Sequence, residues 1–288
     1  MADLAHSYRI RTSPAVAPAY PSFALRVCDV PLVVKGLPPP LGERFSALMR
    51  PFVVELGGAA APTVIEVCER PDGELAIVRD GRVVAAYGDA NQLLQQLEWH
   101  VVTAALEGTS AYASIHGAAF VRGTSAVMLV AESGAGKTTI TLGMMRRGWE
   151  PLSDDIVLID AETLAIQPFP RCFHVDGATR ELALDESLVE WPGAIPGYAR
   201  PLRWATSGVR PTAVLLAERC QTCFSRLRAV TLAEVAGALG VNAIRSGLPR
   251  PQLARVAVRI AADVSHGGRL LNARLEDTLD LIEEISQR

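Results

Sequence analysis

The sequence predicts an α/β fold made of two parts, and three observations support this prediction. A glycine-rich stretch stands between a predicted strand at 126–131 and a predicted helix at 138–147, the order found in phosphate-binding α/β domains. Short β-branched runs around an Asp-Gly turn at 80–81 predict a small, β-rich lobe over residues 1–90. A helical pattern then begins a larger second domain, which we assign to residues 91–288.

The strands of the first part are predicted from the turn-forming residues that separate them. Proline is frequent here, and the run Pro38-Pro39-Pro40 interrupts any regular pattern. Apolar and β-branched runs between these breakers predict strands, and the last two runs flank the Asp-Gly turn as a hairpin. The predicted strands are 23–27, 51–56, 63–68, 75–78 and 83–87.

The second part begins with a predicted helix at 91–106. Leu93, Leu97 and Val101 recur at helical spacing with glutamines between them, and Gly108 ends the segment. Further along, apolar runs predict strands, two of which form a hairpin around the turn at 161–163. These strands are 118–122, 126–131, 156–160, 164–168 and 213–217.

The remainder of the chain is less regular. Residues 171–210 carry Pro, Gly, Trp and Arg without clear periodicity, which predicts a long functional loop. Thr231 and Glu234 form a capping box that begins a short helix. Apolar residues spaced from Leu275 to Ile285 mark one face of a carboxy-terminal helix.

The composition is that of a folded protein without an overall basic charge. Hydrophobic residues make up 49% of the chain and charged residues 20%, as in globular proteins. The net charge of −3 provides no positive field that would attract nucleic acid. Aromatic residues make up only 6% of the chain, so few side chains could stack on bases. No apolar run approaches the ~20 residues that cross a bilayer, and the amino terminus lacks signal-peptide features. We therefore expect a cytoplasmic protein with no nucleic-acid or membrane partner.

The five cysteines are an odd, sparse set and do not predict a disulfide framework. Cys220 and Cys223 have the CxxC spacing that supplies half of a zinc site. A full site needs two more ligands, and the sequence has no second CxxC and no HxxxH. We therefore favour two thiols after a buried strand over a zinc site.

Residues 131–138 read Ala-Glu-Ser-Gly-Ala-Gly-Lys-Thr and match a P-loop except that alanine replaces its first glycine. The two glycines allow successive N–H groups to point at phosphate oxygens, and the following helix adds the positive end of its dipole. The lysine supplies a cation for the β- and γ-phosphates, and the threonine hydroxyl can bind Mg²⁺. We expect the nucleotide phosphates to lie on Ser133, Gly134, Ala135, Gly136, Lys137, Thr138 and Thr139.

Two positions compete for the acid that assists the reaction. Asp160 ends an apolar run, as an ordinary Walker B aspartate does, but it also precedes the turn at 161–163, where a solvated turn acid is common. Asp154 and Asp155 follow Leu152-Ser153, and two adjacent carboxylates are harder to explain as turn residues. We favour the Asp154–Asp155 pair.

These motifs resemble those of the HPr kinase/phosphorylase superfamily, whose P-loop core is similar to that of phosphoenolpyruvate carboxykinase. Three segments carry the resemblance in the same order, over about residues 112–170. They are Ile115-His116-Gly117, the loop from Glu132 to Thr138, and the segment from Gly148 to Asp155.

The resemblance implies a P-loop kinase core that uses ATP and Mg²⁺, with Mn²⁺ as an alternative metal. Lys137 and Thr138 would bind phosphate and metal, and Asp154 would be the base that accepts the proton of the attacking hydroxyl. Asp155 would bind Mg²⁺ or hold the site together, and His116 would lie near the acids and the γ-phosphate. Phosphoryl transfer needs such charge neutralisation and one proton acceptor.

The chain also departs from the bifunctional enzymes of this superfamily. Where they carry an acid-bearing Glu-x-Arg-Gly stretch, this chain has Pro-Phe-Pro-Arg-Cys at 168–172, without an acid. This layout is closer to shorter HPr-kinase-like proteins found beside peptide natural-product genes. The resemblance therefore makes Arg171 a candidate phosphate or substrate contact, and implies transfer to a hydroxyl, most often serine, of a peptide or protein such as a ribosomal natural-product precursor.

Two other functions stay open at this point. One is a kinase that phosphorylates a hydroxyl of a small molecule, because no motif in the sequence identifies the site that binds the acceptor. The other is a nucleotide-binding regulatory module without turnover, against which the paired acids argue, since a pure binder needs no base. HPr kinases assemble into rings, so a homo-oligomer is one expectation, although no motif marks an assembly surface.

Overall fold

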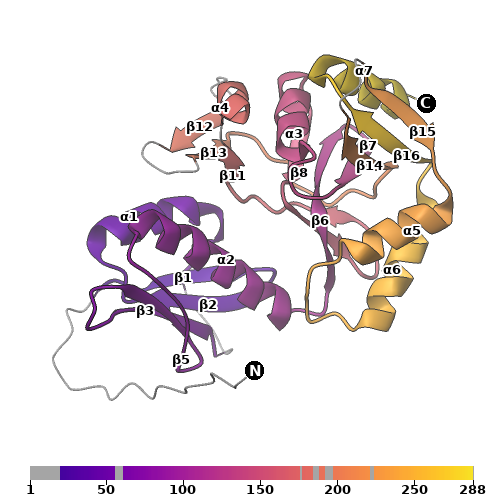
Figure 1. Ribbon diagram of the computed structural model, residues 1–288. Helices are drawn as coiled ribbons and strands as arrows, with labels where there is room; N and C mark the ends of the chain where they lie inside the picture. The colour runs from indigo at the N-terminus through magenta and orange to yellow at the C-terminus, as the bar shows by residue number, and fades with distance from the viewer. Residues whose placement is uncertain are drawn as a thin grey trace, which may run out of the picture. The chain divides into compact units, whose positions relative to one another are not determined.

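The computed structural model describes residues 20–55, 61–175, 177–183, 188–191, 197–220 and 224–287. The chain has a mixed α/β fold and divides into two compact units, with the division after Ala105 (Figure 1). Helix α2 (Ala90–Gly108) therefore belongs for most of its length to the first unit, whereas the second domain was predicted to begin at residue 91.

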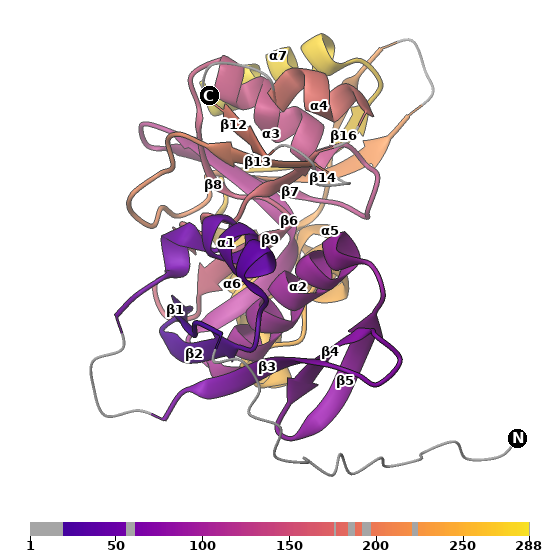
Figure 2. The same cartoon turned by 90° about the vertical axis from the view of Figure 1, so that its left-hand side faces the viewer.

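The first unit is built on one five-stranded sheet with the order β1-β2-β3-β4-β5. All of its pairs are antiparallel except β2 with β3, which are parallel. Figures 1 and 2 show α1 and α2 on the same face of this sheet. The elements before α2 are β1 (Phe23–Val27), β2 (Val30–Lys35), α1 (Pro39–Leu48), a 3-10 turn (Arg50–Phe52), β3 (Thr63–Glu69), β4 (Leu75–Arg79) and β5 (Arg82–Tyr87).

The predicted strands 23–27 and 63–68 and the hairpin around 80–81 are confirmed. The proline run begins α1 instead of only interrupting the chain, because proline is tolerated in the first helical turn, where its missing N–H has no partner to lose. The strand predicted at 51–56 is wrong: Arg50–Phe52 form a 3-10 turn followed by a single bridge at Val53. Leu56 lies outside the described residues.

The second unit contains an eight-stranded sheet with the order β10-β9-β6-β7-β14-β16-β15, and β8 also pairs with β6. Strand β14 is parallel to both β7 and β16, whereas β6 is antiparallel to β7, β8 and β9. The strands are β6 (Tyr112–Arg122), β7 (Ser125–Val130), β8 (Glu150–Ser153), β9 (Ile156–Asp160), β10 (Ile166–Gln167), β14 (Ala213–Arg219), β15 (Arg226–Ala229) and β16 (His266–Asn272).

Helices cover both faces of this sheet, as Figure 1 shows. One core lies between the sheet and α3 with α7, and it includes Ile140 and Leu279. The other lies between the sheet and α5 with α6, and it includes Leu239 and Ile260. Because both faces are buried, the central strands β7 and β14 are apolar along most of their length, as in doubly covered sheets. The helices are α3 (Lys137–Arg146), α5 (Leu232–Val241), α6 (Arg250–Asp263) and α7 (Leu275–Ser286), and the predicted capping box at Thr231 is present.

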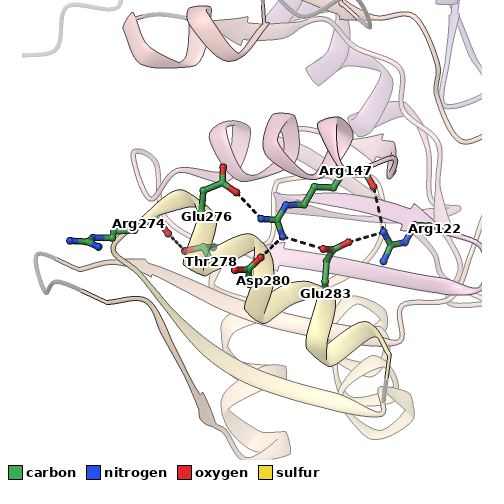
Figure 3. Close-up of polar contacts among 7 residues, drawn as sticks. All are labelled: Arg122, Arg147, Arg274, Glu276, Thr278, Asp280 and Glu283. Carbon is green, nitrogen blue, oxygen red and sulfur yellow. Dashed lines mark hydrogen bonds and ion pairs between the residues drawn. The ribbon is translucent and has the colours of Figure 1, made fainter.

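Ion pairs connect the carboxyl end of α3 to α7. Arg147, the residue that caps α3, contacts Glu276, Asp280 and Glu283 on successive turns of α7, at 2.7, 2.6 and 3.1 Å (Figure 3). Arg122 reaches Glu283 from β6 at 2.7 Å. Single exposed pairs contribute only about 0–1 kcal/mol, but five charges in one network hold the two helices in one alignment. The helix that begins at the glycine-rich loop is thereby fixed at its far end.

The segment 171–210, for which the sequence predicts a long loop, is partly regular. It forms a three-stranded antiparallel sheet with the order β11-β13-β12, together with a short helix. Elements this short carry too few residues to show a period, so pattern analysis could not detect them. They are β11 (Phe173–Val175), α4 (Gly177–Ala183), β12 (Leu188–Trp191) and β13 (Gly197–Pro201).

Among the described residues, Cys28, Cys68, Cys172 and Cys220 form no disulfide. Cys223, the second half of the predicted CxxC pair, lies outside the described residues. Within the described parts of the chain, each helix is too short or too polar to traverse a lipid bilayer.

Candidate active site

The glycine-rich loop joins the end of β7 to the start of α3, as the sequence predicted. Gly134 and Gly136 have φ values of 80° and 92°, in the left-handed region where a side chain is strained. Ala131, at the position of the missing first glycine, has no positive φ, so its methyl group is tolerated there. A Cβ on Gly136 would also lie 2.9 Å from Nδ2 of Asn272, so this close approach needs glycine for a second reason.

Lys137 is the first residue of α3, and its side chain is folded into the loop with only 7% of the residue exposed. Its ammonium group donates to the carbonyl oxygens of Ala131 and Glu132 and contacts Nε2 of His116, each at 2.9 Å. Burial lowers the pKa of Lys137, while the charges of Asp155 and Asp154 oppose that shift. The ammonium group of Lys137 is therefore held against the backbone of the loop.

The paired acids stand where two strands meet along one edge of β6. Ser153 of β8 is opposite Ala119, and Ile156 of β9 is opposite His116. Asp154 and Asp155 lie between these two pairings, so they are presented at the junction of β8 and β9. The φ of Asp155 is 71°, a left-handed conformation that costs energy in a residue with a side chain and is frequent at functional sites.

Asp154 is 5% exposed and faces the start of α3. Its Oδ2 accepts a 2.9 Å hydrogen bond from Oγ1 of Thr138. Its Oδ1 is buried and has no hydrogen-bond partner among the described residues. Burial raises the pKa of Asp154 to about 6; the Thr138 hydrogen bond opposes this shift and the charge of Asp155 adds to it. A buried carboxyl oxygen without a partner is costly, and it is ready to receive a ligand or a proton.

Asp155 has a different environment from its neighbour. Its Oδ1 lies 3.2 Å from Nδ1 of His116, and its Oδ2 lies 3.7 Å from Nη1 of Arg171. Burial acts to raise the pKa of Asp155, but the hydrogen bond with His116 and the charge of Arg171 outweigh burial and lower it to about 2. Two adjacent carboxyls with pKa values moved in opposite directions are typical of sites where acids take separate roles.

One cavity of about 700 Å³ contains all the residues predicted to act in phosphoryl transfer, from the loop, the acid pair, His116 and Arg171. Arg171 is 4% exposed and already has Asp155 as an acid partner, and its contact with a substrate stays a prediction. Part of the lining was not predicted from the sequence, namely Cys172, His174, Thr179, Arg219, Asn272, Ala273 and Leu275. None of these belongs to a recognisable motif, although Arg219 and Asn272 stand at the carboxyl ends of the parallel strands β14 and β16, where ligand-binding residues often lie.

Asp160, the competing candidate, is a turn residue as predicted. Its Oδ1 accepts hydrogen bonds from the backbone N–H groups of Glu162 and Thr163 and from the Thr163 hydroxyl, at 3.0, 2.7 and 2.9 Å. These hydrogen bonds outweigh the opposing effect of burial and lower the pKa of Asp160. It does not line the cavity. The acid next to the loop is Asp154.

The oxygen atoms around Thr138 suit a Mg²⁺ ion, which prefers carboxylate, hydroxyl and phosphate oxygens. Thr138 was predicted to share the metal with Asp155, yet its hydroxyl contacts Asp154, whereas Asp155 contacts His116 and Arg171. The unpartnered Oδ1 of Asp154 adds this residue to the candidate ligands. In the described chain no group of three or more His, Cys, Asp or Glu side chains could hold a metal by itself. A metal here would therefore depend on phosphate oxygens, as Mg²⁺ in nucleotide sites commonly does.

Comparison of the chain with protein-family models and with curated proteins finds no match. Among solved structures, one similar chain is the Hpr(Ser) kinase/phosphatase from Coxiella burnetii. The sequence identity is 12%, the match covers 60% of this chain and 92% of that chain, and the TM-score is 0.29. A likeness this distant carries no functional argument.

Proposed function

We propose that this chain is an ATP-dependent phosphotransferase that moves the γ-phosphoryl group to a hydroxyl of a peptide or protein. The observation that carries the proposal is the 2.9 Å hydrogen bond from Thr138, at the phosphate loop, to the buried carboxyl of Asp154. A P-loop alone binds nucleotide, but a carboxyl with one free oxygen beside it supplies what a transfer reaction also needs, a proton acceptor.

The proposed reaction is a direct displacement. The acceptor oxygen bonds to the γ-phosphorus while the bond from that phosphorus to the β–γ bridging oxygen breaks, and ADP leaves. Asp154 accepts the hydroxyl proton, and its pKa near 6 suits a base that must be ionised at neutral pH and still bind a proton. Lys137 stabilises charge on the phosphates. Mg²⁺, when held by Thr138 with Asp155 or Asp154, supplies further charge neutralisation.

The acceptor class follows from the motifs. The stretch at 168–172 resembles that of shorter HPr-kinase-like proteins, and a peptide or protein serine is the acceptor that the resemblance implies. Arg171 and His174 line the cavity on the side of the acids, where the acceptor hydroxyl must enter. These two side chains are therefore the proposed boundary of the acceptor site.

A transfer assay with ATP labelled at the γ-phosphate tests the proposal. The purified protein is incubated with Mg²⁺ and a library of serine, threonine and tyrosine peptides, and products are detected by mass spectrometry. We expect a phosphorylated serine peptide whose alanine counterpart stays unmodified. Labelling only in a parallel panel of sugars and amino alcohols would assign a small-molecule kinase instead. Bound nucleotide with no transfer in either panel would indicate a regulatory binding module.

A further inference from the structure

The cavity continues past the phosphate loop to the ends of two parallel strands. Strands β14 and β16 pair in parallel, with Arg219 opposite Asn272 at their carboxyl ends. Strand β14 also pairs in parallel with β7, the strand that leads into the loop. Arg219, Asn272, Ala273 and Leu275 line the same cavity as the loop. The carboxyl ends of parallel strands are the usual place for ligands in open α/β sheets.

The side chain of Arg219 is directed to the loop side of the sheet by strand alternation. Ala217, two residues earlier, packs in the core shared with α3 and α7, whereas Leu216 packs in the core of α5 and α6. Because side chains two apart share a face, Arg219 lies on the side of α3. Glu218 points the other way and forms an ion pair with Arg269.

The guanidinium of Arg219 makes no hydrogen bond or ion pair with any residue in the described part of the chain. The other two cations of the cavity are committed, because Lys137 contacts its own loop and His116, and Arg171 pairs with Asp155. An uncommitted guanidinium beside an anion-binding loop is well suited to a phosphate, since its planar fork can make two parallel hydrogen bonds.

The surface next to Arg219 is held in a fixed position. Nδ2 of Asn272 donates to the carbonyl oxygen of Ala135 in the loop at 3.2 Å, and its Oδ1 accepts from the Thr278 hydroxyl at 2.9 Å. The backbone N–H of Cys220 donates to the carbonyl oxygen of Asn272 at 2.8 Å. The ends of β14 and β16 are thus tied to each other and to the loop.

The direction of a bound nucleotide follows from the position of the base. Under the proposed function the γ-phosphate must lie next to Asp154, which contacts Thr138 at the start of α3. The rest of the nucleotide must then extend away from the acids. Besides the loop, His116, the acids and the segment 171–179, the cavity is lined by Arg219, Asn272, Ala273 and Leu275.

We infer that Arg219 contacts the nucleotide, with its guanidinium on the α- and β-phosphates, and that the nucleoside lies over Ala273 and Leu275 at the ends of β14 and β16. This orientation rests on the proposed function, because only a reaction at Asp154 fixes which end holds the γ-phosphate. The phosphate contact itself requires only that the loop binds nucleotide.

Calorimetric titrations with ADP–Mg²⁺, inorganic tripolyphosphate and adenosine test the inference without any transfer reaction. We expect Arg219→Ala to weaken ADP and tripolyphosphate binding by about 10–100-fold, the range for a lost charge-assisted hydrogen bond. Arg219→Lys should recover part of this affinity, because lysine restores the positive charge but cannot make two parallel hydrogen bonds to one phosphate. The matched control is Arg228→Ala, which removes the same charge from an exposed arginine of β15 outside the cavity and should leave affinity unchanged.

Wild-type affinity for ADP in folded Arg219→Ala protein would overturn the inference. A loss of adenosine affinity equal to the loss for ADP would also overturn it, because the contact would then be to the nucleoside. A wild-type protein that binds no ADP would remove both this inference and the proposed function. Nucleotide binding that depends on Arg219, in a protein that transfers phosphate to no acceptor, would support the phosphate contact of Arg219 and refute the proposed function.

Discussion

Nζ of Lys137 lies 2.9 Å from Nε2 of His116, and the opposite ring nitrogen, Nδ1, lies 3.0 Å from the carbonyl oxygen of Asp155. A lysine ammonium has only donors, so Nε2 must accept and Nδ1 must carry the ring proton. His116 thus links the side chain of Lys137 to the acid pair. Since Lys137 also donates to two loop carbonyls, a phosphate must displace one of three existing partners.

This link predicts that His116 positions the site. His116→Ala removes the acceptor that holds Lys137 and the donor that faces Asp155, so both charges gain freedom next to the phosphates. We expect kcat to fall by about 10²-fold, because a displacement of about 1 Å in a reacting group can cost that much. ADP affinity, measured by calorimetry, should change only a few-fold. An unaltered kcat would mean that the contacts of His116 are structural only.

Lys137→Ala tests the phosphate loop itself. It removes the cation expected between the β- and γ-phosphates, and we expect weaker ATP–Mg²⁺ binding together with loss of most transfer. Calorimetry and the transfer assay measure the two effects separately. A Thr141→Ser variant is a suitable control, because Thr141 is buried one turn further along α3 and its hydroxyl bonds to the carbonyl oxygen of Lys137 without lining the cavity. Wild-type affinity and turnover in Lys137→Ala would show that the loop is not a phosphate site.

The sequence predicted which residues would line the candidate site wherever they are close together in the chain. The glycine-rich loop and the Asp154–Asp155 pair could be picked out because each is a contiguous motif next to a predicted element. Arg219 and Asn272 could not be found this way, since they meet the loop only through the order β7-β14-β16. That order depends on non-local pairing, which a single sequence does not display.

The roles of the two acids show the same limit. Adjacent aspartates suggested a base and a metal ligand, but the sequence could not say which one faces Thr138. Pairing of β8 and β9 along β6 sets this choice, since it buries Asp154 beside Thr138 and turns Asp155 toward His116 and Arg171.

The opposite pKa shifts of the two acids predict opposite effects on stability. Burial raises the pKa of Asp154 from 3.8 to about 6, so between these pH values the folded protein holds a proton that the unfolded chain releases. Stability therefore falls as pH rises through this window, and the cost is fully present at pH 7. Asp154→Asn should raise the free energy of unfolding by about 1–3 kcal/mol at pH 7 and by little below pH 4.

Asp155 should behave in the opposite way. His116 and Arg171 outweigh burial and lower its pKa to about 2, so it stabilises the fold above pH 3.8, and this contribution is lost as pH falls through 2. Asp155→Asn should therefore destabilise the protein at pH 7. Urea unfolding at pH 4 and pH 7, in a chelator so that no metal masks the carboxyls, measures both variants. A destabilised Asp154→Asn protein at pH 7 would contradict the assignment of burial as the dominant cause.

The last prediction separates the candidate base from the turn acid. Asp154→Asn keeps an oxygen that can accept the Thr138 hydrogen bond, but the amide cannot take the hydroxyl proton. We expect near-normal ATP–Mg²⁺ binding with a loss of about 10²–10⁴-fold, mainly in kcat. Asp155→Asn should instead raise the Mg²⁺ concentration that half-saturates the rate, as expected of a metal ligand.

Asp160→Asn is the matched control, because it makes the same chemical change on a residue that only closes the turn at 161–163. It should cost about 1 kcal/mol of stability through weaker turn hydrogen bonds and leave kcat unchanged. Transfer rates and unfolding curves for the three variants decide the assignment. An inactive Asp160→Asn variant together with an active Asp154→Asn variant would assign the catalytic acid to Asp160, the ordinary Walker B position. The hydrogen bond between Thr138 and Asp154 would then no longer support the proposal of phosphoryl transfer.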